Sequence, residues 1–366
     1  MRERRQIVDL WRRGGARVLV TVVRVNGSSY RRPGARLLLG ESGEYAGSIS
    51  GGCLETEIVR KAVWKVREGA VIERYSTLFD DTAEVPFGLG CGGVIDLLLE
   101  PVETLEGKAM LTAMEHALKG ERSKVVTWLP GEGKTLRRMV LSESDEILFA
   151  SEGLGDKKLA CAHGLQAGEV YEGRFVEEMR VPQRLFVLGA GDDARPLVAM
   201  ATMMGWSVVV ADGRTHLARR ERFPEAERVL ALEEGGFPGL GIQRDDAVVV
   251  MTHSYEQDRA LLASVLPIAP RYLGMLGARH RSSLLVSEAS AMAALSIEQS
   301  CERIWAPVGL DLGGEGPESI ALAVMAEVQA VCMGRLGASR RLTPQDVSRY
   351  VSEGGAARYL AVQCAS

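Results

Sequence analysis

Two cysteines in the first hundred residues stand between glycines and could carry out sulfur chemistry. Cys53 lies in the sequence Ser-Gly-Gly-Cys-Leu-Glu, and Cys91 lies in Gly-Leu-Gly-Cys-Gly-Gly. Glycine neighbours leave a thiol uncovered and let backbone N–H groups approach whatever the sulfur binds. Cys53 also opens a predicted helix, whose positive dipole end favours a thiolate. The two cysteines therefore suit sulfur chemistry or a soft metal, and we predict that Cys53 and Cys91, with Gly51 and Gly52, form a ligand site; the alternative is that both cysteines occupy tight turns.

A loop near the N-terminus has the composition of an anion site. After a predicted strand, the sequence Gly-Ser-Ser-Tyr-Arg-Arg-Pro-Gly combines two hydroxyl groups with two guanidinium groups. Ser28 and Ser29 can donate hydrogen bonds, and Arg31 and Arg32 can each form two hydrogen bonds to an oxyanion. We predict that these four residues bind an anionic ligand; the alternative is a solvated loop.

A third group of candidates lies in the second half, where Gly-Ala-Gly-Asp-Asp-Ala follows a strand and opens a helix. Gly189 and Gly191 fit the dinucleotide-binding pattern G-x-G-x-x-A, and Asp212 ends the next strand, as an acid that binds ribose hydroxyls would. Asp192 and Asp193, however, stand where a pyrophosphate would approach the helix and would repel it. The motif therefore predicts a Rossmann fold with weak or no binding of NAD(P).

Ligands of such sheets bind outside the carboxyl ends of the strands. His253 and Arg279 follow later strands of this half, so we expect them to line one crevice with Gly189, Gly191 and Asp212. A histidine and arginines around a crevice suit an anionic ligand, such as a phosphate or a pterin pyrophosphate. The alternative for His253 is a capping or packing role.

These residues need two α/β domains to position them. The sequence predicts an N-terminal mixed α/β domain at 1–150, a linker at 151–183, a Rossmann-like parallel-sheet domain at 184–335 and a helical tail at 336–366. Apolar runs that alternate with helical patterns predict the parallel sheet. The predicted strands are 17–25, 36–39, 44–49, 71–77, 94–99, 124–129, 137–141, 185–188, 207–211, 247–252 and 272–276, and the predicted helices are 53–68, 105–118, 194–204, 256–265 and one after Pro317.

Composition narrows the classes of partner. The chain has 366 residues, a net charge of −4 and 5% aromatic residues, which argues against a nucleic-acid partner. No apolar run is long enough to span a membrane, and no apolar stretch follows the basic N-terminus as in a signal peptide. Six cysteines without C-x-x-C pairs indicate free thiols. We expect a cytoplasmic protein.

Five motifs in this order resemble the XdhC/CoxI family. They are the Gly-Ser-Ser loop with arginine, the Gly-Cys-Leu-Glu helix start, the Gly-Cys-Gly-Gly turn, the Rossmann half, and Pro-Val-Gly-Leu-Asp-Leu-Gly at 307–313. The chain departs from the family at Asp192, where many members have histidine, and at Gly316, where many have threonine.

The resemblance implies an accessory chaperone of xanthine dehydrogenase and related molybdenum hydroxylases. Such a protein binds molybdenum cofactor, assists its sulfuration with sulfur from a cysteine desulfurase, and helps insert it into the apo-hydroxylase. It also implies a homodimer with no catalytic activity of its own. The alternatives are an NAD(P)-dependent oxidoreductase with His253 as acid or base, and an interaction protein without a small ligand.

Overall fold

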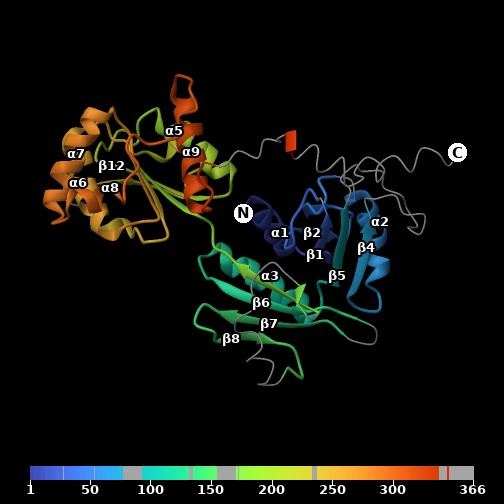
Figure 1. The fold of residues 1–366 in the computed structure, drawn as a ribbon. Coiled ribbons are helices and arrows are strands. Elements are labelled where there is room, and N and C mark those ends of the chain that lie inside the picture. The colour runs from blue at the N-terminus through green and yellow to red at the C-terminus, as the bar shows by residue number, and fades with distance from the viewer. Residues whose placement is uncertain are drawn as a thin grey trace. The chain divides into compact units, whose positions relative to one another are not determined.

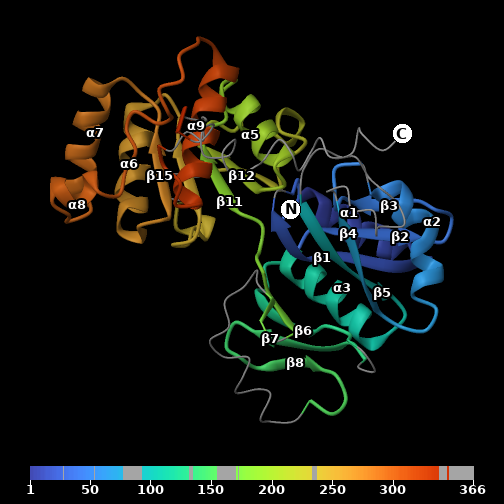
Figure 2. The ribbon, with the colours of Figure 1, turned by 45° about the vertical axis from the view of Figure 1, so that its right-hand side comes forward.

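The computed structural model describes residues 1–27, 29–52, 54–76, 93–131, 135–154, 170–171, 173–232, 237–337 and 344–345 (Figures 1 and 2). The chain divides between Val181 and Pro182 into two compact units, here called the N-terminal and the C-terminal unit. None of the helices in the described ranges is long and apolar enough to cross a membrane.

The N-terminal unit is built on two antiparallel sheets of five strands each. Their strand orders are β3-β2-β1-β5-β4 and β8-β7-β6-β10-β9. The strands of the first sheet are β1 (Ala16–Gly27), β2 (Arg36–Gly40), β3 (Tyr45–Gly47), β4 (Val71–Ser76) and β5 (Gly93–Pro101). Those of the second are β6 (Ser123–Trp128), β7 (Arg137–Ser142), β8 (Ile147–Ala150), β9 (Val170–Tyr171) and β10 (Arg174–Met179).

Alternating apolar side chains divide the first sheet between two cores. Val18 and Val20 of β1 pack on one side with Ile58 of helix α2 (Glu55–Lys65). Leu19, which points to the other side, packs with residues of α1 (Arg2–Arg13), α3 (Leu105–Leu118) and the second sheet. Helices α1 and α3 thus share a core with both sheets, and Figure 2 shows α3 between them.

The C-terminal unit contains a five-stranded sheet in the order β13-β12-β11-β14-β15. All four strand pairs are parallel. This is the Rossmann order, and it confirms the parallel sheet predicted from the sequence. The strands are β11 (Arg184–Leu188), β12 (Ser207–Asp212), β13 (Arg228–Ala231), β14 (Ala247–Val250) and β15 (Tyr272–Met275).

Helices cover both faces of this sheet because its strands are apolar on both sides. Leu185 and Val187 of β11 share a core with α5 (Ala194–Met203) and α9 (Pro317–Cys332). Phe186 and Leu188 point the other way and pack with α6 (Tyr255–Val265) and α7 (Arg279–Met292). Helix α8 (Ile297–Cys301) follows α7.

The structure contains elements that sequence patterns did not predict, among them α1, α7 and β13. Strand β10 lies inside the range 151–183, which the sequence predicts as a linker, and it pairs with β6. Its sequence, Arg-Phe-Val-Glu-Glu-Met, is unusually polar for a buried strand. Glu177 is nevertheless buried, because its carboxylate forms an ion pair with the buried guanidinium of Arg36. Most of the helical tail predicted at 336–366 lies outside the described residues.

Candidate functional site

The loop that precedes Cys53 is held by one buried carboxylate. Glu55, in the first turn of α2, is 2% exposed. Its carboxylate accepts hydrogen bonds from the backbone N–H groups of residues 49–52, at N···O distances of 2.9 to 3.2 Å. The hydroxyl groups of Ser48 and Ser50 donate to the same carboxylate. The loop therefore closes around a side chain of its own helix.

This arrangement changes what Gly51 and Gly52 can do. Both N–H groups, which the sequence suggests as donors to a ligand, donate to Glu55 instead. Burial by itself raises the pKa of Glu55, but the hydrogen bonds from Ser50, Ser48 and Ile49 outweigh burial and lower that pKa to about 2. Glu55 is thus an anion at neutral pH.

The loop that contains Ser29, Tyr30, Arg31 and Arg32 lies against the loop at residues 49–52. A Cβ atom at Gly51 would lie 2.9 Å from Cδ1 of Tyr30, so only glycine allows the ring to approach this closely. Arg31 forms an ion pair with Glu3 of α1, whereas Arg32 is exposed. The hydroxyl oxygen of Ser29 is buried and has no hydrogen-bond partner among the described residues.

The third N-terminal motif meets the same end of the first sheet. Gly27, the last residue of β1, pairs with Gly93, the first residue of β5. Ser28 follows Gly27 in the sequence, and Cys91 precedes Gly93 by two residues. Ser28, Cys53 and Cys91 lie outside the described residues, so their roles stay predictions. Among the residues that are described, no group of three or more His, Cys, Asp or Glu side chains could hold a metal ion.

In the C-terminal unit, the turn from β11 to α5 has the backbone of a dinucleotide-binding turn. Gly189 has a φ of +136°, and a Cβ atom there would lie 2.3 Å from the carbonyl oxygen of Met251. The turn therefore requires glycine for close packing against the chain after β14. Its next N–H group, that of Ala190, donates to Oδ2 of Asp212 at 2.7 Å.

Asp212 does not face a crevice, in contrast to our expectation. It is 0% exposed, and both of its oxygens accept hydrogen bonds from the guanidinium of Arg214, at 2.9 and 2.7 Å. Burial raises the pKa of Asp212, but the bonds from Arg214 and Ala190 outweigh it, and the net shift is downward. A carboxylate surrounded in this way binds its own turn rather than a ribose hydroxyl.

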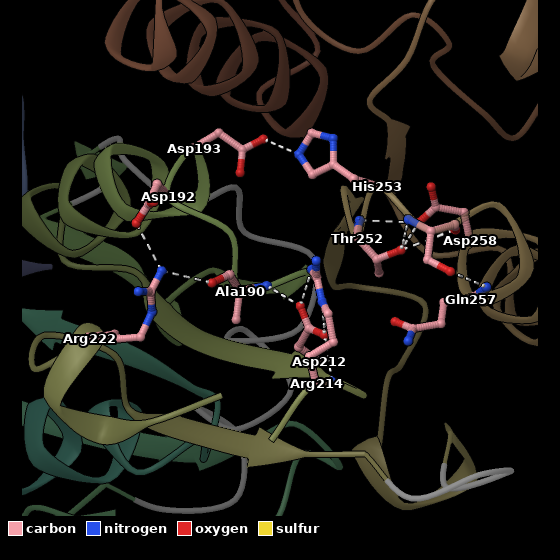
Figure 3. A network of polar contacts seen from close by, with 11 residues as sticks. Ala190, Asp192, Asp193, Asp212, Arg214, Arg222, Thr252, His253, Gln257 and Asp258 are labelled. Carbon is pink, nitrogen blue, oxygen red and sulfur yellow. Dashed lines mark hydrogen bonds and ion pairs between the residues drawn. The ribbon is translucent and has the colours of Figure 1, made fainter. Parts of the chain in front are cut away.

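The two aspartates that open α5 also have partners within the chain (Figure 3). Asp192 forms an ion pair with Arg222 at 2.9 Å. Asp193 lies 2.7 Å from Nε2 of His253, which follows β14. His253 has a φ of +64°, a left-handed conformation that is uncommon for residues other than glycine. Carboxylates thus stand where the Rossmann turn would otherwise admit a phosphate.

A pocket of about 420 Å³ opens beside this Asp193–His253 pair. Arg281, from the first turn of α7, also lines it, and its guanidinium donates to Asp258 at 2.7 Å. Asp258 is 0% exposed and also accepts hydrogen bonds from the backbone and the hydroxyl group of Thr252. The remaining lining residues are mostly apolar: Leu276, Gly277, Ala278, Pro307 and Ile320.

The structure gathers only part of the crevice predicted from the sequence. A Cβ atom at Gly191 would lie 3.9 Å from the His253 ring, so these two residues are neighbours. Gly189, Asp212 and Arg279 are not among the residues that line the pocket, and Arg279 is exposed. Arg281, two positions later, takes the place expected for Arg279.

Sequence reasoning also missed Glu55 and Asp258 as organising carboxylates. The only sequence signal is that Glu55 lies in the first turn of α2 and Asp258 in the first turn of α6. Acidic residues at such positions usually stabilise only the helix end. The sequence does not show that either carboxylate is buried or that it accepts several hydrogen bonds.

Each half of the chain matches a model of a known protein family. A model described as the XdhC and CoxI family matches residues 10–76, and a model of the XdhC Rossmann domain matches residues 185–328. The chain belongs to the XdhC/CoxI family. A crystal structure described as a xanthine dehydrogenase from Bacillus halodurans superimposes with a TM-score of 0.78 and 28% identity, covering 94% of this chain and 99% of that one.

Two curated relatives of this XdhC/CoxI chain extend over most of its length. A protein from Bacillus subtilis, named as a probable subunit of xanthine dehydrogenase, is 29% identical over 85% of this chain and 92% of its own. A molybdenum cofactor insertion chaperone from Escherichia coli, PaoD, is 24% identical over 87% of this chain and 84% of its own.

Proposed function

We propose that this protein is an accessory chaperone that binds molybdenum cofactor and assists its sulfuration and insertion into a xanthine dehydrogenase-type molybdenum hydroxylase. The names of the Bacillus subtilis and Escherichia coli relatives support the hydroxylase and the cofactor, respectively. A cysteine desulfurase would supply the sulfur, and the protein would act as a cytoplasmic homodimer.

The observation that carries this proposal is the meeting of three N-terminal motifs at one end of the first sheet. Gly27 pairs with Gly93, and Tyr30 lies against Gly51. These contacts join the segments that precede or follow Ser28, Cys53 and Cys91. A pterin with a phosphate and a soft metal needs anion donors and thiols within the length of one ligand.

In this proposal each residue of the N-terminal site has one task. The thiols of Cys53 and Cys91 would contact the molybdenum end of the cargo. Arg32 is exposed, and the hydroxyl oxygen of Ser29 lacks a partner within the described ranges; these two residues would bind its phosphate together with Ser28. Arg31 would contribute only if it left Glu3.

The alternative, an NAD(P)-dependent oxidoreductase, has less support. Asp192 and Asp193 occupy the phosphate position of the turn, and Asp212 is buried beneath Arg214. A dinucleotide would meet carboxylates where it needs donors.

Replacement of Cys53 by alanine tests the proposal. The full chain is loaded with molybdenum cofactor and passed over a sizing column, and the retained pterin is measured together with activation of an apo-hydroxylase. We expect Cys53→Ala to lower retention by roughly tenfold or more, because a metal contact is lost, with little change in melting temperature.

Cys301→Ala is the matched control, since Cys301 is an exposed free cysteine of the C-terminal unit. It should retain the cofactor as the unmodified protein does. Full retention and full activation by Cys53→Ala would remove Cys53 from the site.

A further inference from the structure

The pocket beside His253 has the composition of a second ligand site. It lies where the segments that follow β11, β14 and β15 meet at the carboxyl edge of the parallel sheet, the place where ligands of such sheets bind. Its volume of about 420 Å³ is within the usual range for small-molecule sites. Its lining combines three polar side chains, those of Asp193, His253 and Arg281, with an apolar wall that includes Leu276 and Ile320.

The guanidinium of Arg281, the cation of this pocket, is oriented by a buried carboxylate. Arg281 donates to the fully buried carboxylate of Asp258, which is fixed in turn by two hydrogen bonds from Thr252. Only one terminal nitrogen of Arg281 is engaged in that bond. The other, Nη1, lies against Gly277 in the pocket wall, where a Cβ atom would be 3.3 Å from it. A guanidinium oriented in this way can bind one oxyanion.

The histidine of the pocket is oriented by Asp193. Nε2 of His253 lies 2.7 Å from Oδ2 of Asp193, and the tautomer with its hydrogen on Nε2 donates to this carboxylate. A neutral ring then presents Nδ1 as an acceptor, and Figure 3 shows this second nitrogen pointing away from Asp193. The left-handed backbone of His253 is a strained conformation of the kind that is found at functional sites.

The charges select among oxyanions. Arg281 is the cation of the pocket lining, and its charge is balanced by Asp258. Asp193 lines the same pocket. Asp193 would therefore repel a doubly charged phosphate ester more strongly than a singly charged carboxylate, which a single guanidinium can bind.

We propose that this pocket binds a small planar carboxylic acid that also carries a hydroxyl or N–H donor. The carboxylate pairs with Arg281, the ring lies on the apolar wall at Leu276 and Ile320, and the donor group bonds to Nδ1 of His253. All residues of this site belong to the C-terminal unit.

The test uses 4-hydroxybenzoate as the probe with the full chain, measured by calorimetry and by the ¹⁵N signals of the histidine rings. A ligand of this size is expected to bind with a dissociation constant on the order of 0.1–10 mM. Benzoate, which lacks the donor, should bind several-fold more weakly. Binding should shift the ring signals of His253.

Variants assign the contacts. Arg281→Gln should weaken 4-hydroxybenzoate binding by roughly tenfold or more, because it removes the charge. Arg281→Lys retains a cation for Asp258 but lacks the planar fork, so it should fold normally and still bind several-fold more weakly. Arg271→Gln is the control, since Arg271 precedes β15 and pairs with Asp245; it should bind as the unmodified protein does.

His253→Gly keeps the positive φ without strain and should abolish the preference for 4-hydroxybenzoate over benzoate. The proposal is overturned if the probe does not bind at tens of millimolar, or if Arg281→Lys and Arg281→Gln both bind it unchanged. Tighter binding of phenyl phosphate than of 4-hydroxybenzoate would overturn the carboxylate assignment.

Discussion

At the scale of a single residue, Glu55 determines the shape of the loop before α2. Its carboxylate accepts hydrogen bonds from the backbone N–H groups of residues 49–52, of which only that of Gly51 is also bonded to the hydroxyl oxygen of Ser48. Glu55→Gln keeps the shape but places an NH₂ group opposite some of these donors. We expect the free energy of unfolding to fall by roughly 2–3 kcal/mol at pH 7, measured by urea titration.

The same residue predicts a dependence of stability on pH. Because the pKa of Glu55 is about 2 in the folded protein and near 4.5 in the unfolded chain, its ionisation stabilises the fold above the unfolded value. This contribution should be lost as pH falls from about 5 to 2, and Glu55→Gln should lack that part of the acid dependence. Glu68→Gln, on an exposed side chain, is the control. Equal stability of Glu55→Gln and the unmodified protein between pH 7 and 3 would contradict this role.

At the scale of an element, the turn from β11 into α5 has the backbone conformation of a dinucleotide-binding turn. Carboxylates of the chain, however, occupy the position where a phosphate would bind. Asp192 pairs with Arg222, Asp193 contacts His253, and the Ala190 N–H group donates to Asp212. We expect no binding of NAD⁺ or NADPH at micromolar concentration, as measured by calorimetry with the full chain. Micromolar binding of either nucleotide would show that the aspartates move aside, and it would revive the oxidoreductase alternative.

At the scale of the whole molecule, buried ion pairs join the layers of the N-terminal unit. Arg138 of β7 donates to Glu100 of β5 at 2.7 and 3.1 Å, and both side chains are almost fully buried. Glu100→Gln leaves the guanidinium without its counter-ion, so we expect the free energy of unfolding to fall by about 3–5 kcal/mol. Glu41→Gln breaks an exposed pair with Arg17 and should cost at most about 1 kcal/mol. Similar losses in both variants would argue against a special role for the buried pair.

The sequence by itself determined four of the five strands of the C-terminal unit, namely β11, β12, β14 and β15. Runs such as those of β11 and β14 are apolar at nearly every position, and such runs are stable only when both faces of a sheet are covered. Together with the glycine turn, this pattern predicted the parallel Rossmann sheet. The motifs likewise predicted the family, because five short patterns in one order are specific even where each is weak.

Only the tertiary structure decided the partners of polar side chains. Asp212 has the position of a ribose-binding acid in the sequence, but Arg214 and Ala190 satisfy it in the fold, and Arg281 rather than Arg279 reaches the pocket. Sequence patterns do not predict β10 because its buried Glu177 requires an ion pair with Arg36, which is 141 residues away in the chain. Apolar periodicity is a local property of the chain, whereas the energy of a buried charge depends on a partner that only folding brings near.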